Sequence, residues 1–256
     1  MKITRPLAFV ALLLLPACLP KRPEIPGVRV PAGPLVQALE QQRRSFTGLK
    51  AVASVKMARA GGKRSFDTVG IVLDDRRRLR VEAYGPLGQS LVTLLWDGKD
   101  ALLRLSDGRI LRPGQAGMEK IFGMGIEAKE LCAVLAGTVP ESVPPADAQA
   151  YCAQNGVCVV EFPEEKDTVR RVHVLSSATG AAARIRMSAQ EVYRSDRLAY
   201  RARYEGLAEK TSSIPLPGTI TIDNPEKDVS VTITYAEADV NVPIGDDAFT
   251  MEETSK

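Results

Sequence analysis

The sequence predicts a mainly β protein, a barrel or half-barrel of about eleven antiparallel strands with an N-terminal helix and two short central helices. Beyond residue 48, apolar and polar residues alternate with a period of two through most of the chain. In the first predicted strand this places one apolar set on a single face: Leu49, Ala51, Ala53, Val55 and Met57. Tight-turn dipeptides such as Asp97-Gly98 and Asp107-Gly108 recur between these runs, as in an antiparallel meander. Helical spacing of apolar residues occurs in the remaining places, before the first strand and between the two runs of strands.

The first eighteen residues have the pattern of a targeting segment. Two basic residues precede the apolar run Leu7 to Leu15, which is too short to span a membrane, so residues 1–17 are expected to be a secretory signal peptide. The run ends in Leu15-Pro16-Ala17-Cys18, which resembles the lipobox of bacterial lipoproteins. The resemblance implies cleavage before Cys18, diacylglycerol on its sulfur and acylation of its new amino group. The alternative is ordinary secretory cleavage, with Cys18 incidental.

Composition narrows the kinds of partner. Removal of the signal peptide takes away Lys2 and Arg5 and lowers the formal net charge from +3 to +1. A chain so close to neutrality is not expected to bind nucleic acid. Aromatic residues make up 5% of the sequence, so a core or a cavity must be largely aliphatic.

The elements follow in a simple order. Residues 18–33 are expected to be an extended tether, because their prolines exclude a helix or a paired strand. A helix is predicted from about Pro34 to Phe46, with Gly48 as its stop. One domain is expected over residues 34–250, ending with the apolar anchor Phe249, and residues 251–256 form a polar tail.

Two runs of strands are predicted. Six short strands lie between Leu49 and Arg112, and five or six more lie between Val157 and Ala236. The strand Gln89 to Trp96 has apolar residues on both faces. One face is expected to line a covered cavity, and the other to meet the N-terminal helix or another sheet face. Leu87 lies at the tip of the turn that precedes this strand.

The two central helices are short and rich in Met, Ile, Leu and Phe, and Gly137 is expected to cap the second. Between two runs of antiparallel strands, such an insertion is expected to cover the open concave side of a curved sheet. If side chains fill the concavity, the helices are part of a core, which the pattern by itself favours. If they do not, the space is an apolar cavity that can hold acyl chains, at about 0.8 kcal/mol per buried CH₂.

The cysteines have separate roles in this interpretation. Cys152 and Cys158 flank a segment that contains the turn dipeptide Asn155-Gly156, so they can face each other across a hairpin and form a disulfide outside the cytoplasm. Cys132 lies in a helical pattern and is expected to be a buried free thiol.

The sequence offers little for catalysis. Its single histidine, His173, lies within a strand and is interpreted as structural. No Cys/His pair has zinc spacing, and neither GxGxxG nor a P-loop is present. The carboxylate pairs Glu164-Glu165 and Asp246-Asp247 lie in polar loops, where solvation explains them. We expect no enzyme activity, no catalytic residue, no metal and no cofactor.

Three segments together resemble the LolA/LolB-like lipoprotein carrier superfamily, and within it most closely the LolB type of outer-membrane lipoprotein receptor. Arg80-Val81, leading to Gly85-Pro86-Leu87-Gly88 and an apolar strand, resembles the LolB strand, its protruding loop and the next strand. Ile121 to Gly137 resembles the two-helix lid segment, and Asn241 to Phe249 resembles the end of LolA-type domains. The resemblance covers roughly residues 34–249, although the segment from Pro140 to Cys158 has no counterpart.

The resemblance implies an incomplete antiparallel β-barrel with a short helical lid over an apolar cavity for lipid or lipoprotein acyl chains. Leu87 takes the place of the membrane-inserting residue; the alternative is a turn leucine folded back on the sheet. The implied location is the periplasmic face of the outer membrane, held by the lipid anchor, with a soluble LolA-like carrier as partner. The rival function is a structural or interaction lipoprotein of an envelope complex. The cavity and lid candidates are Leu91, Leu94, Met118, Ile121, Phe122, Met124, Ile126, Leu131 and Leu135.

Overall fold

The computed structural model describes residues 22–112, 123–141, 147–165, 167–176, 185–208 and 215–250. The expected signal peptide, Cys18 and the polar tail lie outside these described residues, and so do the lid candidates Met118, Ile121 and Phe122.

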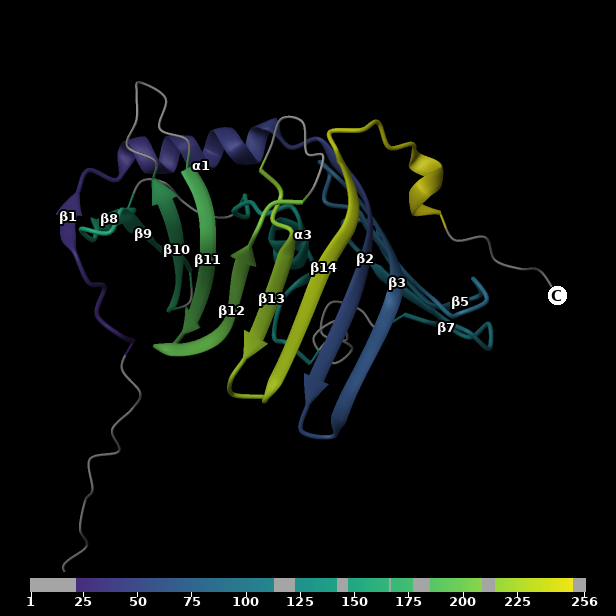
Figure 1. The fold of residues 1–256 in the computed structure, drawn as a ribbon. Helices are drawn as coiled ribbons and strands as arrows, with labels where there is room; N and C mark the ends of the chain where they lie inside the picture. Colours follow the sequence, from purple (N-terminus) through teal and green to yellow (C-terminus); the bar gives the residue numbers. More distant parts are fainter. Residues whose placement is uncertain are drawn as a thin grey trace, which may run out of the picture.

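The described chain forms one strongly curved sheet of fourteen strands, and all of its strand pairs are antiparallel (Figure 1). The strands are β1 (Val28–Val30), β2 (Gly48–Arg59), β3 (Gly62–Asp74), β4 (Leu79–Tyr84), β5 (Ser90–Trp96), β6 (Ala101–Leu105), β7 (Ile110–Leu111), β8 (Gln149–Cys152), β9 (Val157–Pro163), β10 (Thr168–Ser176), β11 (Ile185–Arg194), β12 (Arg197–Glu205), β13 (Thr219–Asn224) and β14 (Val229–Val240).

The strand order shows that the sheet is an incomplete barrel. It runs β1-β8-β9-β10-β11-β12-β13-β14-β2-β3-β4-β5-β6-β7, so β1 and β7 are the two edges and the sheet does not close. The two predicted runs of strands are joined where β14, the last strand, pairs with β2. The predicted fold class is confirmed, with fourteen strands instead of about eleven.

The structure corrects the prediction of an unpaired tether. Val28–Val30 pairs with β8 as an edge strand. Pro26 and Pro31 flank this strand without interrupting it, and an edge strand needs a partner on one side only. Gly27 has a φ of +125°, and a Cβ there would come 2.6 Å from the Cys152 carbonyl oxygen. The last part of the expected tether is therefore folded against the sheet.

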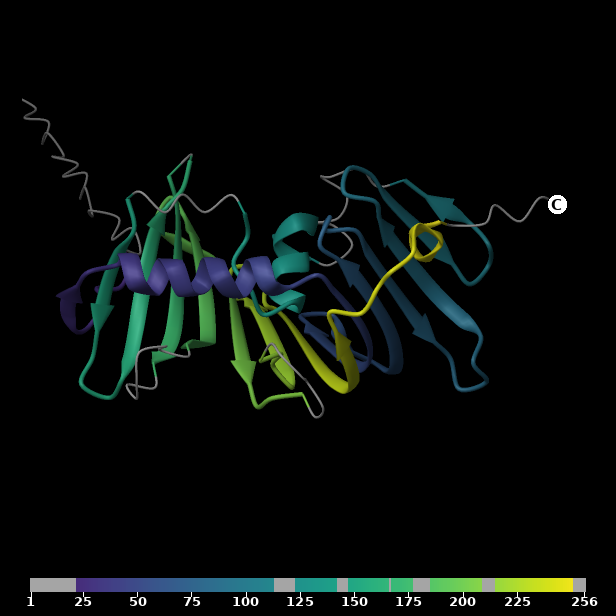
Figure 2. The same cartoon turned by 90° about the horizontal axis from the view of Figure 1, so that it is seen from above.

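The N-terminal helix α1 (Gly33–Ser45) has Pro34 in its first turn and Phe46 as its C-cap, close to the predicted bounds. Figure 2 shows it lying across the ends of the strands β8 to β12. Its buried residues are Val36 and Leu39. Neither helix that the structure describes is long and apolar enough to cross a membrane.

The outer side of β4 meets the C-terminal 3₁₀ turn η1 (Asp246–Phe249). Arg80 donates a hydrogen bond of 3.4 Å to the Ala248 carbonyl oxygen. The Arg78 guanidinium lies 4.3 Å from the ring centroid of Phe249, which is buried as the predicted anchor. The C-terminal turn is therefore held against the sheet by Arg78, in the turn before β4, and by Arg80 of β4.

Candidate functional site

Residues 123–139, which contain most of the predicted lid, are called the lid segment from here on. They lie inside the concave face of the sheet (Figure 1). Its helix α3 (Ala128–Leu135) begins with a capping box in which Glu127 and Glu130 bond each other's backbone N–H groups. It ends before Gly137, which has a φ of +63°, as predicted for the C-terminal stop. From residue 124 to 139, every residue except Glu127 and Lys129 is buried. With Lys129 as its single exposed residue, α3 packs as part of the interior.

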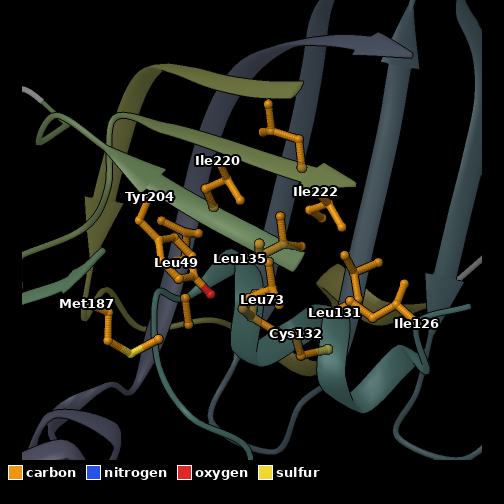
Figure 3. Packing of buried hydrophobic residues seen from close by; sticks show 14 of the residues in the cluster. Leu49, Leu73, Ile126, Leu131, Cys132, Leu135, Met187, Tyr204, Ile220 and Ile222 are labelled. Carbon is orange, nitrogen blue, oxygen red and sulfur yellow. The ribbon is translucent and has the colours of Figure 1, made fainter. Parts of the chain in front are cut away.

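Side chains fill the space between α3 and the sheet. Figure 3 shows Leu131 and Leu135 among residues of β2, β3 and β13. These wall residues are almost fully buried: Leu49, Leu73, Ile220 and Ile222. The structure therefore shows a closed state in which the concave face beneath α3 is a packed aliphatic core.

The structure brings together most of the described lid and cavity candidates. Leu94, Met124, Ile126, Leu131 and Leu135 are each at most 4% exposed and belong to one core cluster. They line no open space among the described residues, because their neighbours pack against them.

Leu91 is placed differently from the other candidates. It is half-buried and lies where the pairing of β4 with β5 shifts register. The shift is a bulge, an irregularity that period-two alternation cannot reveal.

Beyond α3 the concave face continues as a strip of half-buried apolar residues, here called the apolar strip: Val55, Met57, Phe66, Val92 and Leu105. Val55 pairs with Phe66 and Val92 with Leu105, so they continue the rows that begin under α3. Alternation in the sequence placed Val55 and Met57 on this face. The alternation gave no sign that this face, fully buried at Leu49, would be only half-buried here.

A second group of residues, here called the latch, ties α3 to the strands β10, β11 and β12. It consists of Glu130, Glu164, Arg170, Arg194 and Tyr200. Arg170 of β10 is 0% exposed. It donates to Glu130 Oε1 at 2.7 Å, to Glu164 Oε1 at 2.7 Å and to the Tyr200 hydroxyl at 3.1 Å. Arg194 of β11 comes within 3.5 Å of Glu130 Oε2. The lid segment is therefore held by a buried ion pair.

The environment of the latch fixes its charges. Burial by itself would lower the pKa of Arg170, but interactions with Tyr200, Glu130 and Glu164 raise it above its usual value. Burial raises the pKa of Tyr200. Arg170 therefore stays positive and Tyr200 stays neutral at physiological pH.

The latch corrects one sequence interpretation. Glu164 was interpreted as a solvated loop residue, but its side chain is 14% exposed and paired with Arg170. Asp246 is 77% exposed, as expected for a loop carboxylate. The two pairs look alike in the sequence, and only the fold shows that one of them borders a buried guanidinium.

Further hydrogen bonds hold the backbone of the lid segment. Its carbonyl oxygens accept bonds from side chains of three other strands and of α1. The donors are Tyr235 to Leu135 at 2.9 Å, Asn224 to Met124 at 2.9 Å, Arg194 to Gly125 at 2.9 Å and Gln42 to Gly137 at 3.2 Å. Glycines with positive φ lie at both ends, at 123, 125 and 137. The segment is thus bounded by residues that accept large backbone changes.

The Leu87 loop is a separate feature on the surface. Leu87 is 92% exposed, more than the other exposed large apolar residues that the structure describes. Gly85 N–H bonds the Gln89 carbonyl at 2.8 Å, and Leu87 N–H bonds Gln89 Oε1 at 3.0 Å. The turn holds the leucine outward, so the alternative of a leucine folded back on the sheet is wrong.

The remaining sequence candidates are structural in this fold. Cys152 and Cys158 are joined by a disulfide between β8 and β9. The Cys132 thiol is buried in α3, and burial raises its pKa to about 12. His173 lies 3.5 Å from Glu191 on the side of β10 opposite the latch.

Solved structures support the fold. A protein domain provisionally assigned to outer membrane lipoprotein sorting, from Vibrio parahaemolyticus, matches with a TM-score of 0.58 at 13% identity, over 84% of this chain and 94% of that one. A DUF1329 family protein from Desulfovibrio piger gives 0.60 at 11% identity, over 85% and 97%. A LolA superfamily protein from Nitrosomonas europaea gives 0.56 at 12% identity, over 87% and 98%.

No family model matches the sequence, and no curated protein matches it. The structural likenesses, at such low identity, show that the chain has the LolA-like incomplete-barrel fold. The expected closeness to LolB stays a prediction.

Proposed function

We propose that this protein is an outer-membrane lipoprotein, anchored by lipidated Cys18 and facing the periplasm, that binds lipid or lipoprotein acyl chains on its concave face. The observation that carries the proposal is the lid segment. It covers an aliphatic concave surface, it is tied to the sheet by breakable polar contacts, and it is bounded by glycines with positive φ. The LolA-like fold supports the same function class.

Binding requires movement of α3, because side chains fill the space beneath it. An acyl chain would replace the leucines of α3 against the same aliphatic walls, gaining about 0.8 kcal/mol per buried CH₂. This gain offsets the burial that α3 loses when it leaves. Exchange of apolar contacts needs no covalent step, so the proposed carrier has no enzymatic activity and no cofactor.

Leu87 would serve delivery to the membrane in a LolB-like role. A leucine side chain held in water gains about 1.5–3 kcal/mol when it enters an apolar phase. Its loop is braced by Gln89 and therefore presents the side chain without further ordering. A soluble LolA-like carrier would supply the cargo.

The second candidate is a structural or interaction lipoprotein of an envelope complex with a permanently filled interior. The burial of every α3 residue except Lys129 favours it, because a packed core alone would produce the same arrangement.

Titration of the purified protein with a fluorescent fatty acid, followed by displacement with unlabelled palmitate, tests the proposal. We expect saturable binding of one chain or a few chains per protein, and we expect native mass spectrometry to find lipid after mild purification. L87E is the matched control, since it should bind the probe like the wild type. Absence of saturable binding, together with recovery of a stoichiometric protein partner, would favour the second candidate.

A further inference from the structure

We propose that Arg170, Tyr200 and Arg194 form a binding site for the anionic group of an amphiphile, a carboxylate or a phosphate, which Glu130 of the lid segment fills in the closed state. The inference rests on the proposed function, and it names the class of lipid that the concave face takes. Glu130 acts as an internal substitute for the ligand.

Arg170 binds two carboxylates, of which one is fixed to the sheet and the other moves with the lid segment. Glu164 lies just after β9, next to the Arg170 strand, and it accepts from Nε of Arg170. Glu130 lies on α3 and accepts from an NH₂ group of the same guanidinium. When the lid segment leaves, Glu164 stays and Glu130 departs. One edge of a buried guanidinium and the Tyr200 hydroxyl are then left facing the vacated space.

A vacated Arg170 requires a new anion. A buried charge that loses one partner is strongly destabilising, because its desolvation is no longer compensated. Arg170 is 0% exposed, and interactions with its neighbours keep its pKa high, so the guanidinium stays charged. An anionic head group restores the lost contact, whereas a neutral head group does not.

Gln190 provides an independent observation. It is 0% exposed, and both its amide nitrogen and its amide oxygen lack a hydrogen-bond partner among the described residues. It pairs with Val172 on β10 and Ala202 on β12, which places it on the same concave face, one row from Arg170. An orphaned buried amide beside a buried cation is what a polar ligand group would satisfy.

The track that α3 would vacate has the polarity of an amphiphile. Its charged end is at Arg170. Its aliphatic wall is formed by the residues against which Leu131 and Leu135 pack in the closed state (Figure 3). The eight residues of α3 span about 12 Å, enough for a large part of an extended acyl chain. Arg194, whose side chain is 41% exposed, lies at the outer side of the charged end, where a head group would enter.

Amphiphiles that share one chain but differ in head-group charge test the inference. Palmitate, 1-hexadecanol and hexadecyltrimethylammonium would compete with a neutral fluorescent probe on the full-length protein. We expect palmitate to bind at least about tenfold more tightly than the alcohol, and the cation to bind most weakly. Inorganic phosphate should not displace palmitate, because it lacks the chain. Displacement by phosphate would overturn the lipid assignment in favour of a free-anion site.

Two substitutions locate the effect. E130Q keeps the capping box, because glutamine also serves at that position, but removes the internal anion. It should raise palmitate affinity by about tenfold and alcohol affinity by less. E164Q is the matched control, because it removes the other carboxylate bound to Arg170 and leaves the lid segment unchanged. It should not raise the affinity for palmitate relative to that for the alcohol. R194Q, at a half-exposed position, should lower the palmitate preference by a few-fold while the protein stays folded.

The outcomes separate the two proposals. If palmitate and the alcohol bind equally well in the wild type and in E130Q, the anion site is wrong while acyl binding stands. If no amphiphile binds at any charge, both proposals fail.

Discussion

The two halves of the concave face use different chemistry within one sheet. In β2–β6 the wall beneath the lid segment is aliphatic, as at Leu49 and Leu73, whereas in β10–β12 it contains the fully buried Arg170, Gln190 and Tyr200. The lid segment lies between the halves and contacts both. Apolar burial supplies stability without direction, while a buried charge fixes where its partner must sit. The aliphatic half therefore makes closure favourable, and the polar half determines its position.

The outer faces differ as well. Across β9 to β13 the register aligns alternating charges in one row: Glu161, Arg171, Glu191, Arg201 and Asp223. Arg171 in this row donates a bond of 2.7 Å to the Pro23 carbonyl, which attaches the N-terminal segment to this half. On the aliphatic half, the loop between β4 and β5 presents Leu87 to solvent. The polar half therefore holds the N-terminal segment through a charged side chain, and the aliphatic half exposes an apolar side chain.

The largest expected effect on stability comes from breaking the latch. R170M removes the guanidinium that Glu130 and Glu164 share and leaves Glu130 with Arg194 alone, so it should lower the free energy of unfolding by about 3–5 kcal/mol. R203M removes a 2.6 Å ion pair with Asp223 at a half-exposed site and should cost less than about 1 kcal/mol. Urea unfolding measures both variants. Equal losses would show that the polar half does not depend on its buried charge.

Truncation in the aliphatic half gives the next effect. L73A removes a side chain that is 1% exposed and packs in the core with Leu49, and it should lower the free energy of unfolding by about 2–4 kcal/mol. Because this loss involves no charge, it should not change with salt concentration. L207A, at a residue 54% exposed, should change stability by less than about 0.5 kcal/mol. A salt-dependent loss in L73A would contradict the division between the halves.

Acid should weaken the polar half first. Burial alone would raise the pKa of Glu191, but interactions with His173, Tyr193 and Arg201 lower it to about 2, against an ordinary value of 4.5. The carboxylate therefore adds stability above its unfolded pKa and loses that stability as pH falls from about 4.5 to about 2. As pH falls through this window, E191Q should lose about 2 kcal/mol less of its free energy of unfolding than the wild type. An E191Q curve as steep as the wild-type curve would be inconsistent with this pairing.

The smallest expected effect on stability is at the Leu87 loop. L87E should change the free energy of unfolding by less than about 0.5 kcal/mol, because the side chain is 92% exposed. It should nevertheless reduce lipoprotein delivery to vesicles. L207E introduces the same charge at another exposed leucine and should deliver normally. Equal losses in delivery would argue against a specific role for Leu87.

The sequence predicted those parts of the fold that depend on residues close together in the chain. Alternation placed Leu49, Ala51 and Ala53 on one buried face, and Gly137 ended α3 where expected. The three-residue strand β1 was missed because the prolines around it argue against a paired strand and three residues are too few to establish a period.

The latch could not be predicted from the sequence. Glu130, Arg170 and Tyr200 come from different elements, and each is an ordinary residue in its local sequence. The register of β10 with its neighbours and the path of the lid segment bring them together. The same holds for Gln190, whose unpartnered amide becomes visible only once the interior is assembled.

Photo-crosslinking with a palmitate that carries a diazirine on its chain tests the central claim most directly. Peptide mapping of the adducts would locate the bound chain. The account predicts saturable adducts on the aliphatic wall beneath α3 and on the apolar strip of β2, β3, β5 and β6. They should be competed by unlabelled palmitate and be stronger in E130Q. No saturable adducts, or adducts confined to exposed sites such as Leu87, would show that the concave face does not receive an acyl chain.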